Sequence, residues 1–322
     1  MRRYLISSSA MDWRIRPLGT AIRLVHPAFT QRSFRSANVL LDRFLAGRWL
    51  GRSTSVTQAF VTRPDGTRLR LLVCRSRRRR PDAPVTGLLW LHGGGYGLGV
   101  PEQDFIFGDL FCGDGSCVAV LPDYRRSTEA PYPAALEDCY LALEWMHQHA
   151  EELCINRRQL FVGGDSAGGG LTAAVCLRAR DEGTIPVTFQ LPLYPMLDDR
   201  GITASSREND APVWNTASNE TAWRLYLRGV DEVPAYAAPA RAEDLRGLPP
   251  ACTFVGSIDP FRDETAEYVR RLRAAGVEAW LREFPGCFHA FDLLAYPAQP
   301  ARQARRFLRD AFRHAQQQYF SG

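Results

Sequence analysis

Ser166 stands in the sequence GDSAGG at residues 164–169, between an apolar run at 160–162 and a stretch of small residues at 171–175. This order predicts a strand, a sharp turn and a helix. A G-x-S-x-G pattern in that position is typical of a nucleophile elbow, in which a strained turn exposes the serine hydroxyl and the flanking glycines avoid clashes. Ser166 is therefore the candidate nucleophile, although Gly and Ser also gather where a helix packs tightly on a sheet.

A second glycine-rich loop, HGGG, begins at His92 directly after a predicted strand. Glycines in that position leave backbone N–H groups free to point at an oxyanion. We expect the N–H groups of Gly93, Gly94 and Ala167 to form an oxyanion hole. The helix that follows Ser166 adds its positive end to the same place. We expect His92 to orient the loop through hydrogen bonds.

A serine nucleophile needs a histidine base, and the base needs an acid that fixes its tautomer. Among the six histidines, only His289 is expected in a loop between a strand and the last helix. It also follows Ser166, as the chain order Ser, Asp, His of a nucleophile-elbow enzyme requires. Asp259 comes just after a predicted strand and is the candidate acid. Weaker candidates are Asp198, Asp199 and Asp292, and Asp263 and Glu264, which suit the first turn of a helix.

Five segments resemble motifs of the hormone-sensitive-lipase-like branch of the α/β-hydrolase esterases, in the same order: HGGG at 92–95, PDYR at 122–125, GDSAGG at 164–169, DPFRDE at 259–264 and FHAF at 288–291. The resemblance covers about residues 55–318. It departs at residues 126–129, where RSTE replaces the usual LAPE, and at Ala290, where Gly is commoner. It implies a serine carboxylesterase that hydrolyses short- to medium-chain acyl esters through an acyl-enzyme intermediate, without a metal or cofactor.

Strands and helices alternate through most of the chain, after a hairpin that Pro-Asp-Gly at 64–66 predicts. The expected strands are 88–91, 117–121, 160–162, 187–191, 252–255 and 279–281, and the expected helices are 103–111, 134–149, 167–180, 264–275 and 303–318. This alternation predicts an α/β fold with a mostly parallel sheet flanked by helices, and the resemblance implies the α/β-hydrolase fold. Sites in such sheets lie beyond the carboxyl ends of the strands, where both glycine-rich loops fall.

Two segments lie outside this alternation. The N-terminal arm, residues 1–53, carries apolar positions at helical spacing after the candidate cap Ser36. The resemblance implies that this arm forms part of a helical cap over the active site, while the alternative is a helix packed outside the main domain. Residues 198–245 are the candidate cap insertion, and the catalytic domain is expected to comprise 54–197 and 246–322.

The insertion is rich in Trp, Tyr, Arg and Asn, with a short helix expected near 221–227. Its large aromatic side chains either line an acyl pocket or attach the insertion to the main domain. The candidates for the substrate pocket are Trp214, Trp223 and Tyr226.

Composition excludes several other classes of protein. A chain of 322 residues with 45% hydrophobic residues suits one large α/β domain with a lid. All 40 basic residues are Arg and the net charge is +5. We expect the arginine run at 77–80 to be a solvated loop and no nucleic acid to bind. Eight cysteines without C-x-x-C spacing indicate no metal site.

Location and assembly are also constrained by the sequence. No stretch of about 18 apolar residues predicts a membrane span, and the first apolar residues are too few for a secretion signal. We therefore expect a cytoplasmic protein that acts on a small-molecule ester. The resemblance is compatible with a homodimer.

Three functions remain in contention. The first is ester hydrolysis, and the second uses the same triad on an amide, a formamide or an acetylated compound. The third is a ligand receptor on the hydrolase fold; the presence of His289 argues against it, because the catalytic histidine is lost in the related receptor. Neither the residues nor the resemblance assigns a chemical role to Asp123, Arg125 or Asp165.

Overall fold

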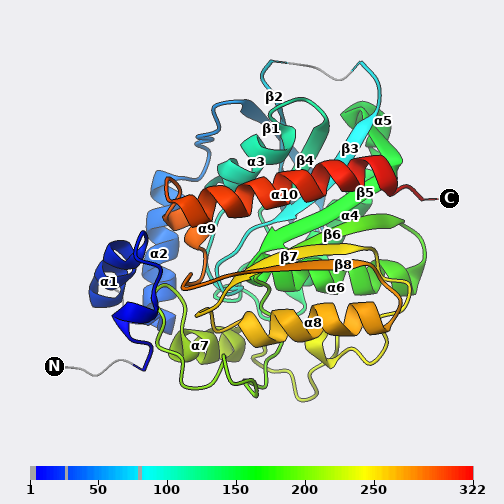
Figure 1. The fold of residues 1–322 in the computed structure, drawn as a ribbon. Helices are drawn as coiled ribbons and strands as arrows, with labels where there is room; N and C mark the ends of the chain where they lie inside the picture. Colours follow the sequence, from blue (N-terminus) through cyan, green and yellow to red (C-terminus); the bar gives the residue numbers. More distant parts are fainter. Residues whose placement is uncertain (1–4, 26–27, 79–81, 322) are drawn as a thin grey trace.

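The computed structural model describes residues 5–25, 28–78 and 82–321. Part of the arginine run at 77–80, and with it that part of the predicted solvated loop, lies outside the described residues. Within them, eight strands form one sheet in the order β1-β2-β4-β3-β5-β6-β7-β8 (Figure 1). The strands are β1 (Thr54–Thr62), β2 (Arg68–Ser76), β3 (Val85–Leu91), β4 (Cys117–Pro122), β5 (Ile155–Asp165), β6 (Val187–Leu193), β7 (Ala251–Gly256) and β8 (Ala279–Phe284).

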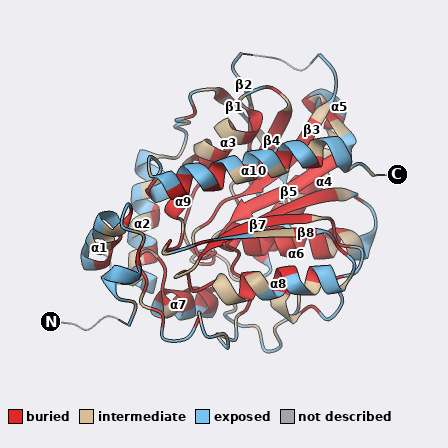
Figure 2. Ribbon diagram, viewed as in Figure 1, coloured by how far each residue is buried: buried red, intermediate tan, exposed pale blue. Residues whose placement is uncertain are grey.

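The pairing of the strands confirms the predicted sheet. β1 and β2 form an antiparallel hairpin, and β2 also pairs antiparallel with β4. Every other neighbouring pair is parallel. All residues of β4 and β7 are buried (Figure 2), as expected for central strands that helices cover on both faces.

Helices cover the two faces of the sheet in two layers. One layer comprises α4 (Ala134–Gln148), α6 (Ala167–Glu182) and α8 (Arg262–Ala274), and the other comprises α3 (Phe105–Cys112) and α10 (Gln299–Gln318). Two short helices complete the connections, α5 (Ala150–Leu153) and α9 (Phe291–Leu294). The predicted α/β class is thereby confirmed.

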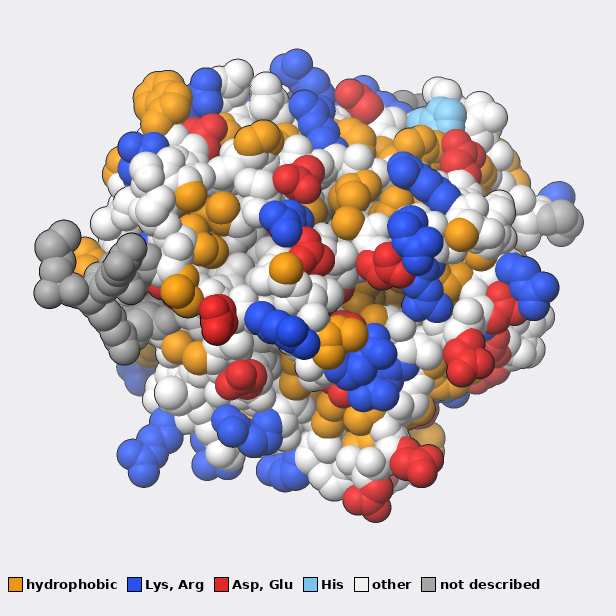
Figure 3. Space-filling view, turned by 60° about the horizontal axis from the view of Figure 1, so that its bottom comes forward, with side chains coloured by type: hydrophobic (Ala, Val, Ile, Leu, Met, Phe, Trp, Pro, Cys, Tyr) orange, Lys and Arg blue, Asp and Glu red, His pale blue; other side chains and the backbone are white. Residues whose placement is uncertain are grey.

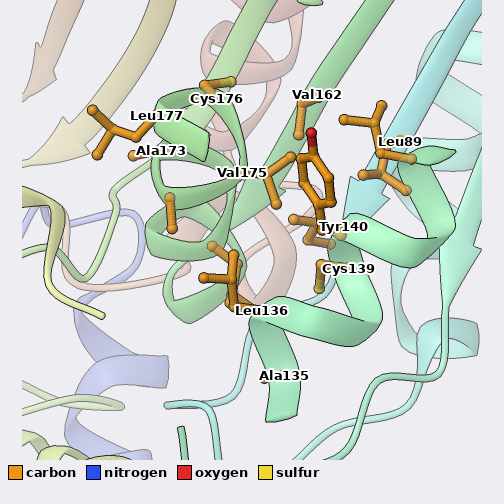
Figure 4. Packing of buried hydrophobic residues seen from close by; sticks show 14 of the residues in the cluster. Leu89, Ala135, Leu136, Cys139, Tyr140, Val162, Ala173, Val175, Cys176 and Leu177 are labelled. Atoms are coloured by element: carbon orange, nitrogen blue, oxygen red, sulfur yellow. The ribbon is translucent and has the colours of Figure 1, made fainter. Parts of the chain in front are cut away.

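The interface between α4, α6 and the sheet shows how the first layer is held (Figure 4). Cys139 and Tyr140 of α4 and Val175 of α6 pack with Leu89 of β3 and Val162 of β5, and all five are almost completely buried. Burial of such side chains stabilises the fold by roughly 1.5–3 kcal/mol each. The packing fixes α6, and therefore the turn that precedes it, against the sheet.

The two segments outside the alternation contain helices of their own. The N-terminal arm holds α1 (Arg16–Val25) and α2 (Gln31–Phe44), and the insertion holds α7 (Thr216–Tyr226). The prediction that Ser36 caps the arm helix is wrong, because α2 begins five residues earlier. Its N-terminal N–H groups are satisfied there by a capping box between Thr30 and Ser33. Figure 1 places α1, α2 and α7 at the end of the molecule where the parallel strands end.

Candidate active site

Three predicted residues meet beyond the carboxyl ends of the strands. Ser166 follows β5, Asp259 follows β7, and His289 lies between β8 and α9. His289 Nε2 lies 2.8 Å from Ser166 Oγ, and His289 Nδ1 lies 2.8 Å from Asp259 Oδ2. The other carboxylate oxygen of Asp259 accepts a 2.9 Å hydrogen bond from the Phe261 N–H. All three side chains are buried, so the arrangement can pass a proton from hydroxyl to imidazole while the carboxylate holds the ring.

The weaker candidates for the acid do not hold the base. None of the five forms a hydrogen bond with His289 in the described part of the chain. Four of them accept hydrogen bonds elsewhere: Asp198 from Arg200 (2.7 Å), Asp199 from Arg241 (2.7 Å), Asp263 from the Ser205 N–H (2.8 Å) and Glu264 from the Leu197 N–H (2.7 Å). The fifth, Asp292, is buried one helical turn beyond His289.

The backbone at Ser166 has the strained conformation expected of an elbow. Its φ of 58° and ψ of −117° lie outside the ordinary regions for a residue with a side chain, which costs about 1–3 kcal/mol. A Cβ on Gly164 or Gly168 would overlap the carbonyl oxygen of Leu91 on β3. Small residues are therefore required here because the elbow approaches the neighbouring strand so closely.

The glycine-rich loop after β3 differs from the prediction in one donor. The Gly93 N–H donates a 2.9 Å hydrogen bond to Oδ1 of Asp165, so it is not a free donor. Among the described residues, the N–H groups of Gly94, Gly95 and Ala167 have no hydrogen-bond partner. Gly95 was not among the predicted donors, because nothing local in the sequence indicates that Gly93 pairs with a residue 72 positions away.

His92 lies beneath this loop, packed flat against Tyr124. The two rings stack with centroids 4.1 Å apart, and the Tyr124 hydroxyl donates a 2.7 Å hydrogen bond to the His92 carbonyl. His92 Nδ1 lies 2.9 Å from the carbonyl oxygen of Gly93. Burial lowers the pKa of His92 to about 4, so the ring is neutral at pH 7 and holds the loop by packing and hydrogen bonding.

The residues on either side of Tyr124 form ion pairs with the surrounding structure. Asp123 accepts a 3.0 Å hydrogen bond from Arg70 on β2. Arg125 binds the carboxylate of Asp138 on α4 with contacts of 2.9 and 3.0 Å. Both therefore anchor the strand end that carries Tyr124 and have no direct contact with the triad.

Buried carboxyl groups lie behind the elbow. Asp104 accepts a 2.8 Å hydrogen bond from the Trp90 indole. Burial raises the pKa of Asp165 to about 6 and that of Asp292 to about 7, and it holds the pKa of Asp104 well above its usual range. The negative charge of Asp165 raises the other two further. These acids therefore retain protons at a pH where exposed carboxyl groups are ionised.

Of the three candidate pocket residues, Trp214 lies nearest the triad. Its ring centroid is 6.2 Å from that of His289, and a Cβ on Gly95 would overlap its six-membered ring. On the arm side it contacts Phe29 at 5.6 Å and Phe34 at 6.3 Å between ring centroids. Trp214 thus forms a wall between the glycine-rich loop, the base and the N-terminal arm.

The other two aromatic candidates pack farther from the base. Tyr226 stacks on Tyr96 of the glycine-rich loop with centroids 3.9 Å apart, and Tyr96 donates a 2.9 Å hydrogen bond to the Met196 carbonyl. Trp223 packs on Tyr96 as well and lines a cavity of about 820 Å³ together with Asn219. Tyr226 therefore attaches the insertion to the main domain.

Two further observations concern the described residues only. No cluster of three or more His, Cys, Asp or Glu side chains there has an arrangement that could hold a metal ion. No helix there combines the length and apolar character needed to cross a bilayer.

The strained serine after β5, the free N–H groups beside it and the histidine beyond β8 together define an α/β hydrolase. The family model for the alpha/beta hydrolase fold matches residues 88–293, and the chain belongs to this family. The resemblance seen in the sequence is thereby confirmed.

Several proteins similar to this chain carry esterase names. Esterase LipI of Mycobacterium tuberculosis is 36% identical over 222 residues, which span 65% of this chain and 66%, just under two thirds, of LipI. Carboxylesterase NlhH of the same species is 34% identical over 231 residues, covering 70% of this chain and 72% of NlhH. The solved structure titled Bacterial Heroin Esterase superimposes with a TM-score of 0.86 at 33% identity, covering 96% of this chain and 99% of that one.

Proposed function

We propose that this protein is a serine carboxylesterase that hydrolyses small esters with short to medium acyl chains. The observation that carries the proposal is the geometry of Ser166, His289 and Asp259, in which two 2.8 Å contacts join nucleophile, base and acid. The esterase relatives support the same class. The proposed steps use protein groups and water alone.

In the proposed reaction, Ser166 Oγ attacks the ester carbonyl while its proton passes to His289 Nε2. His289 then gives this proton to the leaving alkoxide, which departs as the alcohol and leaves the acyl group on the serine. A water molecule attacks the acyl-enzyme with His289 again as base, and the acid is released. Asp259 accepts the Nδ1–H throughout, keeping the ring in the tautomer that leaves Nε2 free and stabilising the imidazolium that forms.

The developing oxyanion is bound in this proposal by the N–H groups of Gly94, Gly95 and Ala167. Their free state supports this role, and Ala167 lies at the N-terminus of the 16-residue helix α6, whose dipole favours negative charge. Asp165 then has a structural role, because its bond to Gly93 fixes the glycine-rich loop next to the elbow. His92 supports the same loop from below.

We propose further that the N-terminal arm and residues 198–245 form the cap over this site, with Trp214 as a wall of the acyl pocket. The contacts of Trp214 with Phe29 of the arm and with the His289 ring support this role. A cytoplasmic location and a homodimer stay predictions.

Labelling with a fluorophosphonate probe tests the nucleophile directly. The probe should modify Ser166, as located by mass spectrometry, and the protein should turn over p-nitrophenyl butyrate. Ser166→Ala should lose both. Ser127→Ala is the matched control, because Ser127 is also buried and its hydroxyl has no hydrogen-bond partner in the described structure. Labelling at another residue, or a Ser166→Ala variant with normal turnover, would refute the assignment.

The bond that is cleaved is tested by substrates that share an acyl group and differ only in ester or amide linkage. We expect a much higher kcat/KM for the esters. Faster cleavage of the amide, formamide or acetylated compound would instead show that the triad serves the alternative reaction.

A further inference from the structure

The charge of this chain is unevenly distributed. The N-terminal arm contains ten Arg and two Asp, a net charge of +8, while the whole chain carries +5. The remaining 269 residues therefore carry −3. Within the arm, Asp12 pairs with Arg14, and Asp42 pairs with Arg126 outside the arm. Such asymmetry between two parts of a chain points to a negatively charged partner for the basic part.

The outward face of α1 is apolar. Every exposed residue of this helix is hydrophobic or Pro: Pro17, Leu18, Ala21, Leu24 and Val25. Positions spaced by three, four and seven residues share one side of a helix, so these five form one stripe. Leu24 and Val25 are 71% and 85% exposed, and Trp13 just before the helix is 68% exposed.

The inward face of α1 shows the reverse polarity. Its buried residues are Gly19 and Arg23. Arg23 donates a 2.9 Å hydrogen bond to the Ile6 carbonyl, and a Cβ on Gly19 would lie 2.9 Å from the Phe288 ring, next to His289. A helix that buries an arginine and exposes its apolar stripe has the opposite orientation from a helix that covers a protein core.

The exposed face of α2 combines apolar and basic side chains. Val39, Leu40 and Phe44 are 66%, 57% and 55% exposed. Exposed arginines accompany them, and none has an ion pair or side-chain hydrogen bond within the described structure: Arg32, Arg35 and Arg43, followed after the helix by Arg48 and Arg52. Arginines without partners next to exposed apolar groups are typical of helices that lie at a membrane surface.

Another face of the molecule is different. Figure 3 brings the lower side of Figure 1 forward, over α7 and α8, and there Arg side chains alternate with Asp and Glu. On α8, Arg270 pairs with Glu267, and in the loop before β7, Arg246 pairs with Asp244. The arm therefore differs from this face in its charge balance: the arm carries a net charge of +8, whereas acidic and basic side chains are mixed over α7 and α8.

We propose that the N-terminal arm docks on an anionic lipid surface. The stripe of α1, with Trp13, enters the boundary between headgroups and acyl chains, and the arginines of α2 bind the phosphates of the lipid headgroups. Each basic residue near such a surface contributes on the order of 1 kcal/mol. With ten residues, α1 is about 15 Å long, half the thickness of the hydrocarbon layer, so the helix lies on the membrane without crossing it.

Two other occupants fit the arm less well. A second copy of the chain related by a two-fold axis would bring one arm of charge +8 against another, which is repulsive. A nucleic acid would attract the arginines but would leave the apolar stripe of α1 in water. An anionic lipid surface satisfies the charges and the stripe together.

Flotation with lipid vesicles tests the proposal on the full-length protein. We expect binding to vesicles of phosphatidylcholine mixed with phosphatidylglycerol, weak binding to phosphatidylcholine alone, and loss of binding at high salt. Arg32→Gln, Arg35→Gln and Arg43→Gln together should weaken binding about a hundredfold. Leu24→Gln should weaken it by about tenfold or more, since a buried leucine is lost.

Matched controls remove the same kinds of side chain elsewhere. Arg306→Gln, Arg309→Gln and Arg313→Gln on α10 change the net charge equally, and Phe320→Gln removes an apolar side chain that is 52% exposed near the C-terminus. These variants should bind the vesicles like the unmodified protein, and all variants should unfold at the same temperature.

Three results would overturn the proposal. The unmodified protein fails to float with anionic vesicles, or the arm and control variants lose binding equally. The third is a dimer in light scattering that Leu24→Gln converts to a monomer, because the stripe would then be covered by a second copy. None of these readouts depends on catalytic activity, so the proposal and the esterase assignment can fail separately.

Discussion

The two sides of the active site are built from different interactions. On the sheet side, short hydrogen bonds fix the loops, such as those from Gly93 to Asp165 at 2.9 Å and from Tyr124 to His92 at 2.7 Å. On the side of the arm and the insertion, aromatic rings supply the contacts nearest the triad, as between Phe29 and Trp214. Hydrogen bonds require narrow ranges of distance and angle, whereas apolar contacts tolerate changes of shape.

This difference separates two tasks. Reacting groups must be held to within a fraction of an ångström, because small displacements cost large factors in rate. A wall that selects acyl groups needs only the right volume. We therefore expect substitutions on the sheet side to lower the rate for every substrate, and substitutions in the aromatic wall to change the order of preference among substrates.

The largest effect is expected from the base. His289→Ala should lower kcat by on the order of 10³-fold or more, because no other described histidine lies next to Ser166 and the hydroxyl is a poor nucleophile without a base. The measurement is kcat on p-nitrophenyl butyrate. His314→Ala, which removes an exposed histidine on α10, is the control and should retain normal activity. Comparable losses in both variants would contradict the role of His289.

Gly95→Ala is expected to lower kcat for every substrate, by a smaller factor than His289→Ala. Gly95 has a φ of +57°, and the added Cβ would overlap Trp214, so the loop must shift and the N–H groups of Gly94 and Gly95 move with it. Loss of oxyanion donors typically costs about 10²- to 10³-fold in kcat.

Gly183→Ala serves as the control for Gly95→Ala, because Gly183 has a similar φ of +65° with nothing within 4 Å of its added Cβ. It should lose about 1–2 kcal/mol of stability and retain normal kcat. Normal kcat in Gly95→Ala would refute the proposed oxyanion hole.

The buried acids behind the elbow make stability depend on pH. Burial raises the pKa of Asp292 in the folded protein to about 7, from an ordinary value of 3.8. Its neutral form therefore contributes stability below about pH 4 that is lost as the pH rises through 7. Asp292→Asn should accordingly stabilise the protein at pH 8 by on the order of 3 kcal/mol relative to its effect at pH 4.

Thermal or urea unfolding across this pH range measures the effect of Asp292→Asn. Asp310→Asn, which removes an exposed carboxylate on α10, is the matched control. Parallel stability curves for the unmodified protein and Asp292→Asn would show that Asp292 is ionised at no cost.

The sequence predicted the sheet side of the active site better than the side of the arm and the insertion. The triad and the elbow follow strands with strong apolar patterns, and the chain order of an α/β hydrolase leaves few choices for Asp259 and His289. The partner of Gly93 could not be predicted, because it depends on how β3 and β5 align in the sheet. Apolar spacing alone indicated a helix in the arm, but it could not show that α2 would bury Asn38 and leave Val39 and Leu40 exposed.

The cap residues show the same limit. The sequence marked Trp214, Trp223 and Tyr226 as aromatic without separating pocket from attachment, because that choice depends on contacts between segments far apart in the chain. In the structure Tyr226 stacks on Tyr96, whereas Trp214 lies beside His289. The orientation of α1, with Arg23 buried and the apolar stripe exposed, also depends on a contact between distant segments, because Gly19 of this helix packs next to Phe288.

The smallest predicted effect concerns selectivity. Trp214→Phe shortens the wall beside His289 without introducing a polar group, so longer acyl chains should fit better. The ratio of kcat/KM for hexanoate to that for acetate p-nitrophenyl esters should rise by roughly three- to tenfold, as expected for a change of pocket volume of this size. Trp145→Phe is the matched control, because Trp145 lies on α4 and stacks on His149 there. An equal decrease in kcat/KM for all acyl lengths in Trp214→Phe would instead show that Trp214 helps to hold the reacting groups in place, as the sheet side does.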